Sequence, residues 1–478
     1  MMLDGGRSTM YLSEETLDRF HLLALETLEK TGVQASEPET LAAMDEAGLD
    51  VAYDERRIRY PPALVEQYLS CIPNRYLIAG RDPKDDLELS MGSLFVRPQS
   101  GCPNVLDLEN GVCRPALMSD IEAMARLNDM LPNIHLAGAL LYPNDVPSED
   151  RDVAVLACLL KLSRKHIYVQ AYEPGGAARM IEIAEVLRGG SREAATRPPF
   201  TLITGPNSPL MITPSELGII RLAAKERMPL MHGSTPTSGL TAPVTLAGQI
   251  VLHHAENLAG LVISQVFQPG TPISYAIRPA TMDMRDANSV WGMVEWGMVT
   301  AALLQLARHH NLVTDVVGLP TDSKALDEQA GLEKGINAIF ATLYGGNIVA
   351  GAGFIETIMT GSLEQLVIDD DLAGIMLRAR RGIEVDDDRL ASRLIQGIGP
   401  GGDYLTDPHT LRHMRSEIFI PAVLNRQNRH NWTRAGAQDL IQSARQRAKD
   451  LIATHSTPPL PEDISKELDR IACRVSGD

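Results

Sequence analysis

The chain has 478 residues, of which 44% are apolar and 22% are charged, and its net charge at pH 7 is −17. A chain of this length can bury a large core, either as one large barrel with additions or as about two or three smaller domains. The negative charge argues against nucleic acid or an anionic membrane as a partner, because both require a basic surface.

The N-terminal stretch and the cysteines indicate a reducing compartment. Residues 1–17 lack a basic segment followed by an apolar one, so we expect no signal peptide. No apolar run approaches the roughly 18 to 20 residues of a membrane span. The five cysteines are scattered and form no CxxC pair, which argues against a disulfide framework or a zinc knuckle. We therefore expect a cytoplasmic protein.

The first part of the chain is predicted to be an elaboration of helices and short strands. Residues 12–47 show helical spacing of apolar residues, and Ser13 can cap the first of two helices. Residues 48–118 contain short extended stretches separated by Gly, Pro and Asn-Gly turn signals. We assign residues 1–118 to this N-terminal elaboration.

From about residue 119, apolar runs alternate with helical segments. Near-continuous apolar strands separated by helices indicate a parallel sheet that is covered on both faces. The predicted strands lie in residues 133–142, 166–172, 199–209, 229–236, 258–267, 271–277, 312–320 and 346–354. About eight strands over roughly 250 residues favour a closed (β/α)₈ (TIM) barrel over an open sheet.

The domain assignment follows from this alternation. No GxGxxG fingerprint follows the first strand and no GxxxxGK[ST] motif occurs, so a nucleotide-binding open sheet loses support. We predict an α/β fold with a (β/α)₈ barrel over residues 119–398. Residues 399–478 are polar and helical, and we assign them to a C-terminal helical extension.

Polar and aromatic side chains collect at the predicted strand ends, where a (β/α)₈ barrel builds its active site. Each of these residues also has an ordinary structural explanation, such as a helix cap or an ion pair. The prediction of an active site therefore depends on polar residues occurring at several strand ends and not on any single residue. These residues are Tyr172, Asn207, His232, Tyr275, Arg278, Asp322, Lys324, Phe354 and Glu356.

Several familiar catalytic patterns are missing. No HExxH motif and no Cys/His cluster with metal-ligand spacing occurs, so we expect no tightly bound metal. The acidic runs at residues 369–371 and 386–388 are interpreted as solvated surface or helix N-termini. No GxSxG elbow occurs either. Either polar groups alone activate the substrate, or a second protein carries the reactive centre.

Four stretches resemble the trimethylamine methyltransferase family, barrel enzymes that methylate a corrinoid protein. They are residues 105–134, 204–210, 318–334 and 399–427, and the resemblance covers most of the chain. The patterns DSKxxDxQAGxE, which begins at Asp322, and GGxYLxxxHTxxxxR, which begins at Gly401, are the most specific. The resemblance implies that the loop at Asp322 lies at the barrel mouth, where a corrinoid partner would present its cobalt.

The resemblance also implies a class of methyl donor. One branch of the family decodes an in-frame amber codon as pyrrolysine and demethylates trimethylamine, and the other branch lacks that residue. Every position here is a standard residue, as in the second branch, whose relatives act on quaternary amines such as glycine betaine. The implied donor is a quaternary amine or a similar onium compound. The chain itself would hold no cofactor tightly, because the corrinoid protein supplies the cobalamin.

Other interpretations stay open. The donor could be a tertiary amine or a sulfonium compound, and the chain could instead be a non-catalytic solute-binding barrel. A homo-oligomer is also left open. The polar residues at several strand ends favour an enzyme over a scaffold.

When a quaternary ammonium compound loses a methyl group, the remaining amine leaves neutral. Co(I) can therefore attack the methyl carbon in line without a general acid. A site that holds the positive charge too tightly would stabilise the ground state, so we expect a modest aromatic or carboxylate lining. Trp291 and Trp296 lie five apart, which on a helix would separate their directions by about 140°. At most one of them would then face the site.

The candidates divide into two sets. Arg278 is our first choice for a betaine carboxylate. Tyr142 also stands near a strand end and could contribute an aromatic face. The substrate-binding candidates are Tyr172, Asn207, His232, Tyr275, Arg278, Trp291 and Phe354, and the catalytic candidates are Asp322, Lys324, Gln329 and Glu356.

Overall fold

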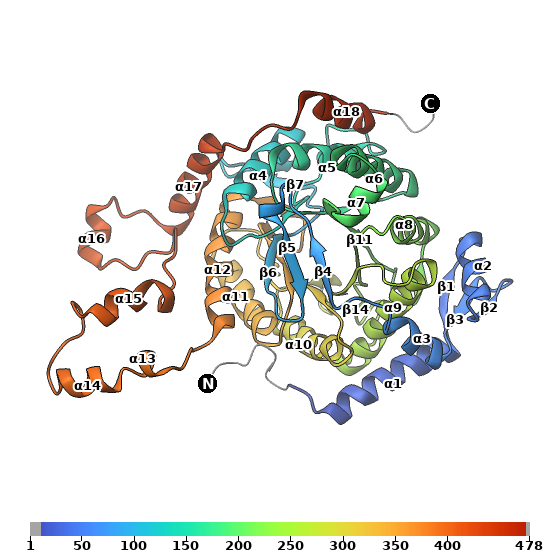
Figure 1. Cartoon of the computed structure of the whole chain (residues 1–478), viewed down its shortest axis with the longest axis horizontal. Helices are drawn as coiled ribbons and strands as arrows, with labels where there is room; N and C mark the ends of the chain where they lie inside the picture. Colours follow the sequence, from blue (N-terminus) through green and yellow to red (C-terminus); the bar gives the residue numbers. More distant parts are fainter. Residues whose placement is uncertain (1–10, 475–478) are drawn as a thin grey trace.

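The computed structural model of the chain describes residues 11–474 and consists of a barrel with additions at both ends (Figure 1). Residues 1–10, on which part of the signal-peptide expectation rests, and residues 475–478 lie outside the described residues. All five cysteines are free. Within residues 11–474, every helix is too short or too polar to span a lipid bilayer.

Eight parallel strands form the barrel, in the spatial order β6-β19-β18-β15-β13-β11-β10-β9. The ring closes through the chain just before β9, where the N–H groups of His135 and Leu136 donate to the Val96 carbonyl at 2.8 and 3.3 Å. The strands are β6 (Phe95–Pro98), β9 (Ala137–Gly138), β10 (Ile167–Gln170), β11 (Phe200–Thr204), β13 (Leu230–His232), β15 (Ile273–Ile277), β18 (Thr314–Val317) and β19 (Ile348–Ala352). The predicted (β/α)₈ barrel is confirmed.

Helices surround the strands as an outer ring (Figure 1). Side-chain caps start several of them, including Thr213 before α8, Asp327 before α11 and Ser362 before α12. The ring consists of α4 (Met118–Met130), α5 (Arg151–Leu162), α6 (Pro174–Arg188), α7 (Ser191–Thr196), α8 (Pro214–Lys225), α9 (Leu246–Phe267), α10 (Val294–His309), α11 (Glu328–Leu343) and α12 (Leu363–Arg381).

Two predicted assignments require correction. Residues 258–267, predicted as a strand, lie inside helix α9. This helix packs against α1, α3, α8 and α10, so it is apolar on almost every side and lacks the periodicity that separates a helix from a buried strand. The strand that replaces it in the barrel is β6, which lies in the segment assigned to the elaboration. The barrel therefore begins before residue 119.

The N-terminal elaboration has two parts. Helix α1 packs against α9 on the outside of the barrel, and a small sheet in the order β12-β1-β3-β2 lies beside it. Ser13 caps α1 through Thr16 N, as predicted. The elements are α1 (Glu14–Lys30), β1 (Val33–Ala35), α2 (Pro38–Glu46), β2 (Asp50–Ala52), β3 (Arg57–Arg59), α3 (Pro62–Leu69) and β12 (Met211–Ile212).

A hairpin closes one end of the barrel. It consists of β4 (Arg75–Ile78) and β5 (Leu87–Ser90), joined through the short helix η1 (Pro83–Asp85). Its apolar side chains form one buried cluster with side chains of the barrel strands, which include Tyr168, Ile203 and Met231. Because this plug fills the lumen from the side opposite the strands' carboxyl ends, the carboxyl ends remain as the site-bearing face.

Short strands lie in the loops that follow the carboxyl ends of the barrel strands. One sheet has the order β20-β21-β7-β8 and another has the order β14-β16-β17. The strands are β7 (Asn104–Leu106), β8 (Cys113–Pro115), β14 (Thr237–Ser238), β16 (Ala280–Asp283), β17 (Asn288–Val290), β20 (Phe354–Ile355) and β21 (Thr360–Ser362).

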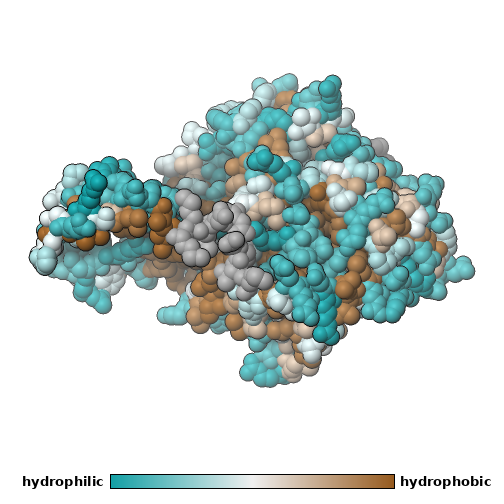
Figure 2. All heavy atoms as spheres, turned by 60° about the horizontal axis from the view of Figure 1, so that its bottom comes forward, coloured by the Kyte–Doolittle hydropathy of each residue, from teal (hydrophilic) through white to brown (hydrophobic). Residues whose placement is uncertain are grey.

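The C-terminal extension leaves the barrel and then returns to it (Figure 1). An arm of four short helices contains no buried helical residue, and Figure 2 shows hydrophobic residues along it. Helix α17 packs against α12 and α4, and α18 packs against α5 and α6. The helices are α13 (Asp387–Leu390), α14 (Ser392–Ile398), α15 (Pro408–Glu417), α16 (Arg429–Arg434), α17 (Leu440–Thr454) and α18 (Glu462–Ala472).

The acidic run at residues 369–371 is buried, so its interpretation as solvated surface is wrong. Asp369 accepts a hydrogen bond from Lys334 Nζ at 2.9 Å, and Asp371 accepts from backbone N–H groups of residues 422–424 at 2.6 to 2.9 Å. These partners come from distant parts of the chain and leave no local sequence signal. The run at residues 386–388 is exposed, as expected.

Candidate active site

An ion pair crosses the barrel lumen. Arg97 of β6 donates from Nε and Nη2 to the two carboxylate oxygens of Asp315 of β18, at 2.8 and 2.9 Å. Both side chains are buried, and the Arg97 guanidinium lies 4.7 Å from the ring centroid of Tyr168. This two-point geometry is the strong form of an arginine–carboxylate pair. Asp315 is therefore already neutralised by Arg97.

Arg278 is a half-buried cation with unused hydrogen-bonding capacity. It follows β15, and its Nη2 contacts the sulfur of Met231 at 2.7 Å. Its Nε is buried and has no hydrogen-bond partner among residues 11–474. Burial lowers the pKa of Arg278 to about 10; Asp315 and Glu216 oppose this shift and Arg97 adds to it. An unsatisfied buried donor on a charged group is costly, so an anionic group here would be stabilised.

Glu216 is a half-buried carboxyl group with a raised pKa. It lies in the first turn of α8, and its Oε2 accepts a hydrogen bond from Gly205 N, just beyond β11, at 3.2 Å. Burial raises the pKa of Glu216 to about 7, although this N–H group and the charge of Arg278 pull it down. Perturbed carboxyls of this kind cluster at functional sites.

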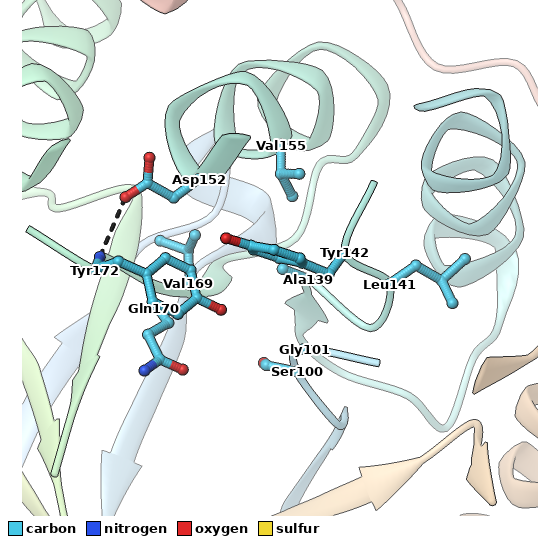
Figure 3. Close-up of a pocket in the computed structure, with 10 residues that line it drawn as sticks. All are labelled: Ser100, Gly101, Ala139, Leu141, Tyr142, Asp152, Val155, Val169, Gln170 and Tyr172. Carbon is cyan, nitrogen blue, oxygen red and sulfur yellow. Dashed lines mark hydrogen bonds between the residues drawn. The ribbon is translucent and has the colours of Figure 1, made fainter. Parts of the chain in front are cut away.

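A small pocket opens between the ends of β6, β9 and β10 and the start of α5 (Figure 3). Its cavity volume is about 20 Å³, room for roughly one water molecule, and it opens to solvent at its mouth. The rings of Tyr142 and Tyr172 meet edge to face with their centroids 5.3 Å apart. Asp152 accepts a hydrogen bond from Tyr172 N at 3.2 Å, and Figure 3 shows Gln170 and Ser100 on the other side of the tyrosines. Two aromatic rings and a carboxylate form a lining that suits an onium group.

The pocket combines a carboxyl group with a cation that already lies on one of its aromatic rings. Burial raises the pKa of the Asp152 carboxyl, while the N–H groups of Tyr172 and Val153 lower it. The Arg151 guanidinium already lies 4.5 Å from the ring centroid of Tyr142. The Tyr172 side of the pocket is more open, since that residue is 41% exposed.

The structure places His232 and Tyr275 outside the lumen. Both are fully buried and alternate along their strands with Met231 and Ala276, which belong to the lumen cluster. His232 Nδ1 lies 3.0 Å from the hydroxyl of Thr204, and burial lowers the pKa of His232 to about 3. The hydroxyl of Tyr275 lies 3.0 Å from a histidine of α9. These two candidates face the surrounding helices.

Trp291 and Phe354 form a buried aromatic cluster beside the mouth. Trp291 stacks on Trp296 at 4.8 Å, because Trp291 precedes the start of α10 and the helical angle of about 140° does not apply. The separation of about 140° predicted for this pair is therefore wrong. Phe354 meets Trp291 edge to face at 6.1 Å and lies 4.9 Å from Lys334 Nζ. Phe354 is fully buried and Trp291 is 8% exposed.

Asp322 fastens the loops of the mouth together. Its carboxylate accepts hydrogen bonds from Trp291 N and Gly292 N, both at 2.8 Å, and from the hydroxyl of Thr357 at 2.6 Å. These contacts join the start of α10 to the loop after β20. In this structure Asp322 holds the shape of the mouth.

The remaining candidates lie in the loops around the mouth. Lys324 is exposed and forms no ion pair with another described residue. Gln329 donates to Glu333 at 2.8 Å, and Glu356 accepts from the hydroxyl of Thr360 at 2.7 Å. The exposed Asn207 lies in a turn, where its backbone pairs with Met211. Lys324 is thus the member of this group that is free to meet another molecule.

Comparison with known proteins identifies the family. Residues 3–476 match the family model described as trimethylamine methyltransferase (MTTB). This chain belongs to the trimethylamine methyltransferase family. It is 30% identical to "Trimethylamine methyltransferase MttB" of Desulfitobacterium hafniense (strain DSM 10664 / DCB-2), over 95% of this chain and 92% of that protein. It is 28% identical to "Glycine betaine methyltransferase" of Desulfitobacterium hafniense (strain Y51), over 96% of this chain and 95% of that protein.

A solved structure shares the fold of this family member. The crystal structure of the Methanosarcina barkeri monomethylamine methyltransferase (MtmB) aligns with a TM-score of 0.56 at 10% identity. The alignment covers 94% of this chain and 89% of that chain, and at this identity it speaks for the fold alone. The relatives are named methyltransferases, so the chain is an enzyme that transfers a methyl group from an amine donor.

Sequence reasoning missed two carboxyl groups of this methyltransferase, Glu216 and Asp152. Both lie in the first turn of a barrel helix, where an acidic residue usually serves the helix dipole. The spacing Thr213-x-x-Glu216 matches a capping box, in which Glu216 would bond back to the cap. Its side chain bonds to Gly205 N instead. A search of the helix starts that follow the strands could have found both residues.

Proposed function

We propose that this enzyme takes a methyl group from a carboxylate-bearing quaternary ammonium compound, such as glycine betaine, and delivers it to the Co(I) corrinoid of a partner protein. The observation that carries the proposal is Arg278, whose guanidinium contacts a sulfur atom and leaves its buried Nε unsatisfied. A carboxylate would supply the missing acceptor, and trimethylamine has none.

The two ends of such a donor suit the two features of the mouth. Arg278 would hold the carboxylate, and Tyr172 and Tyr142, with Asp152 nearby, are the aromatic and acidic groups of the mouth that suit an onium group. Onium groups offer no hydrogen-bond donor, so aromatic faces and carboxylates are the groups that recognise them. Both features belong to the carboxyl ends of the strands, where a barrel enzyme binds its substrate.

The proposed chemistry requires orientation more than acid or base catalysis. The corrinoid, when the partner brings it, supplies a nucleophilic Co(I). The carbon–nitrogen bond breaks with its electron pair on nitrogen, so the amine leaves neutral and takes up no proton in that step. The chain's own residues would align one methyl group with the mouth and keep water away from it. Weak aromatic contacts suit this task, because they hold the charge without over-stabilising the ground state.

The corrinoid protein is proposed to dock on the loops around the mouth. Lys324 stands exposed in the most specific motif of the family, and Asp322 fixes the loops beside it. An exposed lysine without an ion pair can meet an acidic group of a partner and can speed their association. The chain is proposed to hold no corrinoid of its own.

A tertiary amine is the second candidate donor, and Glu216 favours it. A carboxyl with a pKa of about 7 can donate a proton to a tertiary amine, which must be protonated so that the remaining secondary amine leaves neutral when its methyl group is transferred. The named relatives include enzymes of both kinds.

A donor panel with free Co(I) cobalamin separates these candidates. We expect glycine betaine to consume the Co(I) absorbance faster than trimethylamine or a sulfonium compound does. Preference for trimethylamine would move the assignment to the tertiary amine. Binding of a donor without any loss of Co(I) would indicate a solute-binding barrel.

A further inference from the structure

Three histidines from separate helices meet on the outer side of the barrel wall. His21 comes from α1, His254 from α9 and His310 from the end of α10. Each offers one ring nitrogen to a group in which all these atoms lie within 4.8 Å of one another. His21 Nδ1 lies 2.9 Å from His254 Nε2, and the rings of His21 and His310 have their centroids 4.0 Å apart.

Two of these histidines have their other ring nitrogen fixed by an oxygen atom. His21 Nε2 lies 2.6 Å from a carboxylate oxygen of Glu66, and His254 Nδ1 lies 3.0 Å from the hydroxyl of Tyr275. The remaining nitrogens, His21 Nδ1 and His254 Nε2, therefore face each other. Metal-binding histidines are held in this way, with one nitrogen on the ion and the other on a carboxylate or another polar group.

His310 carries a buried ring nitrogen without a hydrogen-bond partner. Its Nε2 is buried and has no hydrogen-bond partner among residues 11–474. Burial lowers the pKa of His310 to about 4, and the charge of His21 lowers it further. Burial also holds the pKa of His254 well below its ordinary value. Neutral imidazole is the form that coordinates a metal ion. Buried polar atoms without partners are uncommon and call for an explanation.

We propose that His21, His254 and His310 bind a divalent transition-metal ion of the zinc class, with Glu66 and Tyr275 orienting two of the ligands. Three imidazoles and an open fourth position form a common zinc coordination set. His310 is only partly buried, so its side of the group can admit water as the fourth ligand.

Such an ion would fasten the N-terminal helix α1 to the barrel, since its ligands belong to α1, α9 and the end of α10. The site lies on the helix side of the wall, as the outward direction of Tyr275 indicates, and it takes no part in the methyl transfer. The inference does not rest on the proposed function.

The sequence predicted no tightly bound metal because a ligand spacing was absent. His21 and His254 are 233 residues apart, so no local motif could reveal the group. Without an ion, a chain of hydrogen bonds can run from the Tyr275 hydroxyl through His254 and His21 to the Glu66 carboxylate. That chain satisfies two histidines but leaves His310 Nε2 without a partner.

The test compares adjacent histidines in the full-length protein. His309 is an exposed neighbour whose Nε2 lies 3.0 Å from Asp18, so His309→Ala is the matched control for His310→Ala. After chelation and dialysis, each protein receives Zn²⁺ or Co²⁺. The readouts are metal content, the visible absorbance of bound Co²⁺ and the thermal midpoint. Circular dichroism of the chelated proteins checks folding, and His310→Gln serves if the alanine variant unfolds.

We expect the wild type and His309→Ala to bind about one ion per chain, with Co²⁺ bands and a thermal midpoint that rises with Zn²⁺. The folded His310 variant should lose all three signals. A wild type that shows none of them, or a His310 variant that retains them, would overturn the proposal. So would their loss in a His409→Ala/His413→Ala double variant, because these residues form an exposed group with Asp388 that could bind metal instead.

Discussion

Replacing Arg278 with alanine should impair carboxylate-bearing donors selectively. The guanidinium contacts Met231 sulfur and leaves Nε without a partner, so its removal breaks no native ion pair among the described residues. A hydrogen bond to a charged group contributes about 2 kcal/mol, which corresponds to roughly 30-fold in kcat/KM. Lysine keeps the charge but lacks the planar fork, so Arg278→Lys should fall between the wild type and alanine.

The assay compares glycine betaine with tetramethylammonium, a carboxylate-free analogue, on each variant. Arg285→Ala removes an exposed arginine from a nearby loop and controls for the loss of positive charge. We expect the betaine to lose roughly 30-fold in kcat/KM on Arg278→Ala, with little change for tetramethylammonium. Equal losses for the two donors would show that Arg278 is structural, and the case for a betaine would then rest on family likeness alone.

Three further outcomes can be measured. Lys324→Ala should raise KM for the corrinoid protein in steady-state kinetics and leave donor KM unchanged; the reverse pattern would remove Lys324 from the docking surface. Phe354→Ala should weaken use of every onium donor. It also leaves a cavity at a fully buried position, so urea denaturation should show that the free energy of unfolding falls by about 3 to 5 kcal/mol. An unchanged free energy of unfolding would contradict the packing. Burial raises the pKa of Glu216 from 4.5 to about 7. Between these two pH values the folded chain keeps a proton that the unfolded chain releases, so the free energy of unfolding should fall as the pH rises from 4.5 to about 7. Glu216→Gln should flatten that fall in thermal midpoints, and an unchanged slope would refute the shift.

The alternation of apolar runs and helices was enough to predict the barrel, because parallel strands covered on both faces leave a clear pattern. The same pattern led to one wrong strand, for a physical reason. Residues 258–267 belong to a helix that other helices enclose, so they show no polar face. Strand β6 was assigned to the elaboration and not to the barrel, because Arg97 and Pro98 interrupt its apolar character and the ion pair of Arg97 with Asp315 forms only across the lumen.

The site was harder to predict because it depends on the direction of each side chain. A one-residue change of register turns a strand residue from the lumen to the helices. The sequence could not show that Met231 faces inward while its neighbour His232 faces α9. The roles assigned to Arg278, Tyr172 and Lys324 remain predictions, although the structure places all three near the carboxyl ends of the strands.

The most direct test of the account follows the methyl group itself. The purified enzyme is mixed with reduced corrinoid protein and glycine betaine that carries ¹³C in its methyl groups. We predict that label appears on the corrinoid and that dimethylglycine forms in equal amount. Label that stays on the betaine, while labelled trimethylamine transfers its methyl group under the same conditions, would contradict the account.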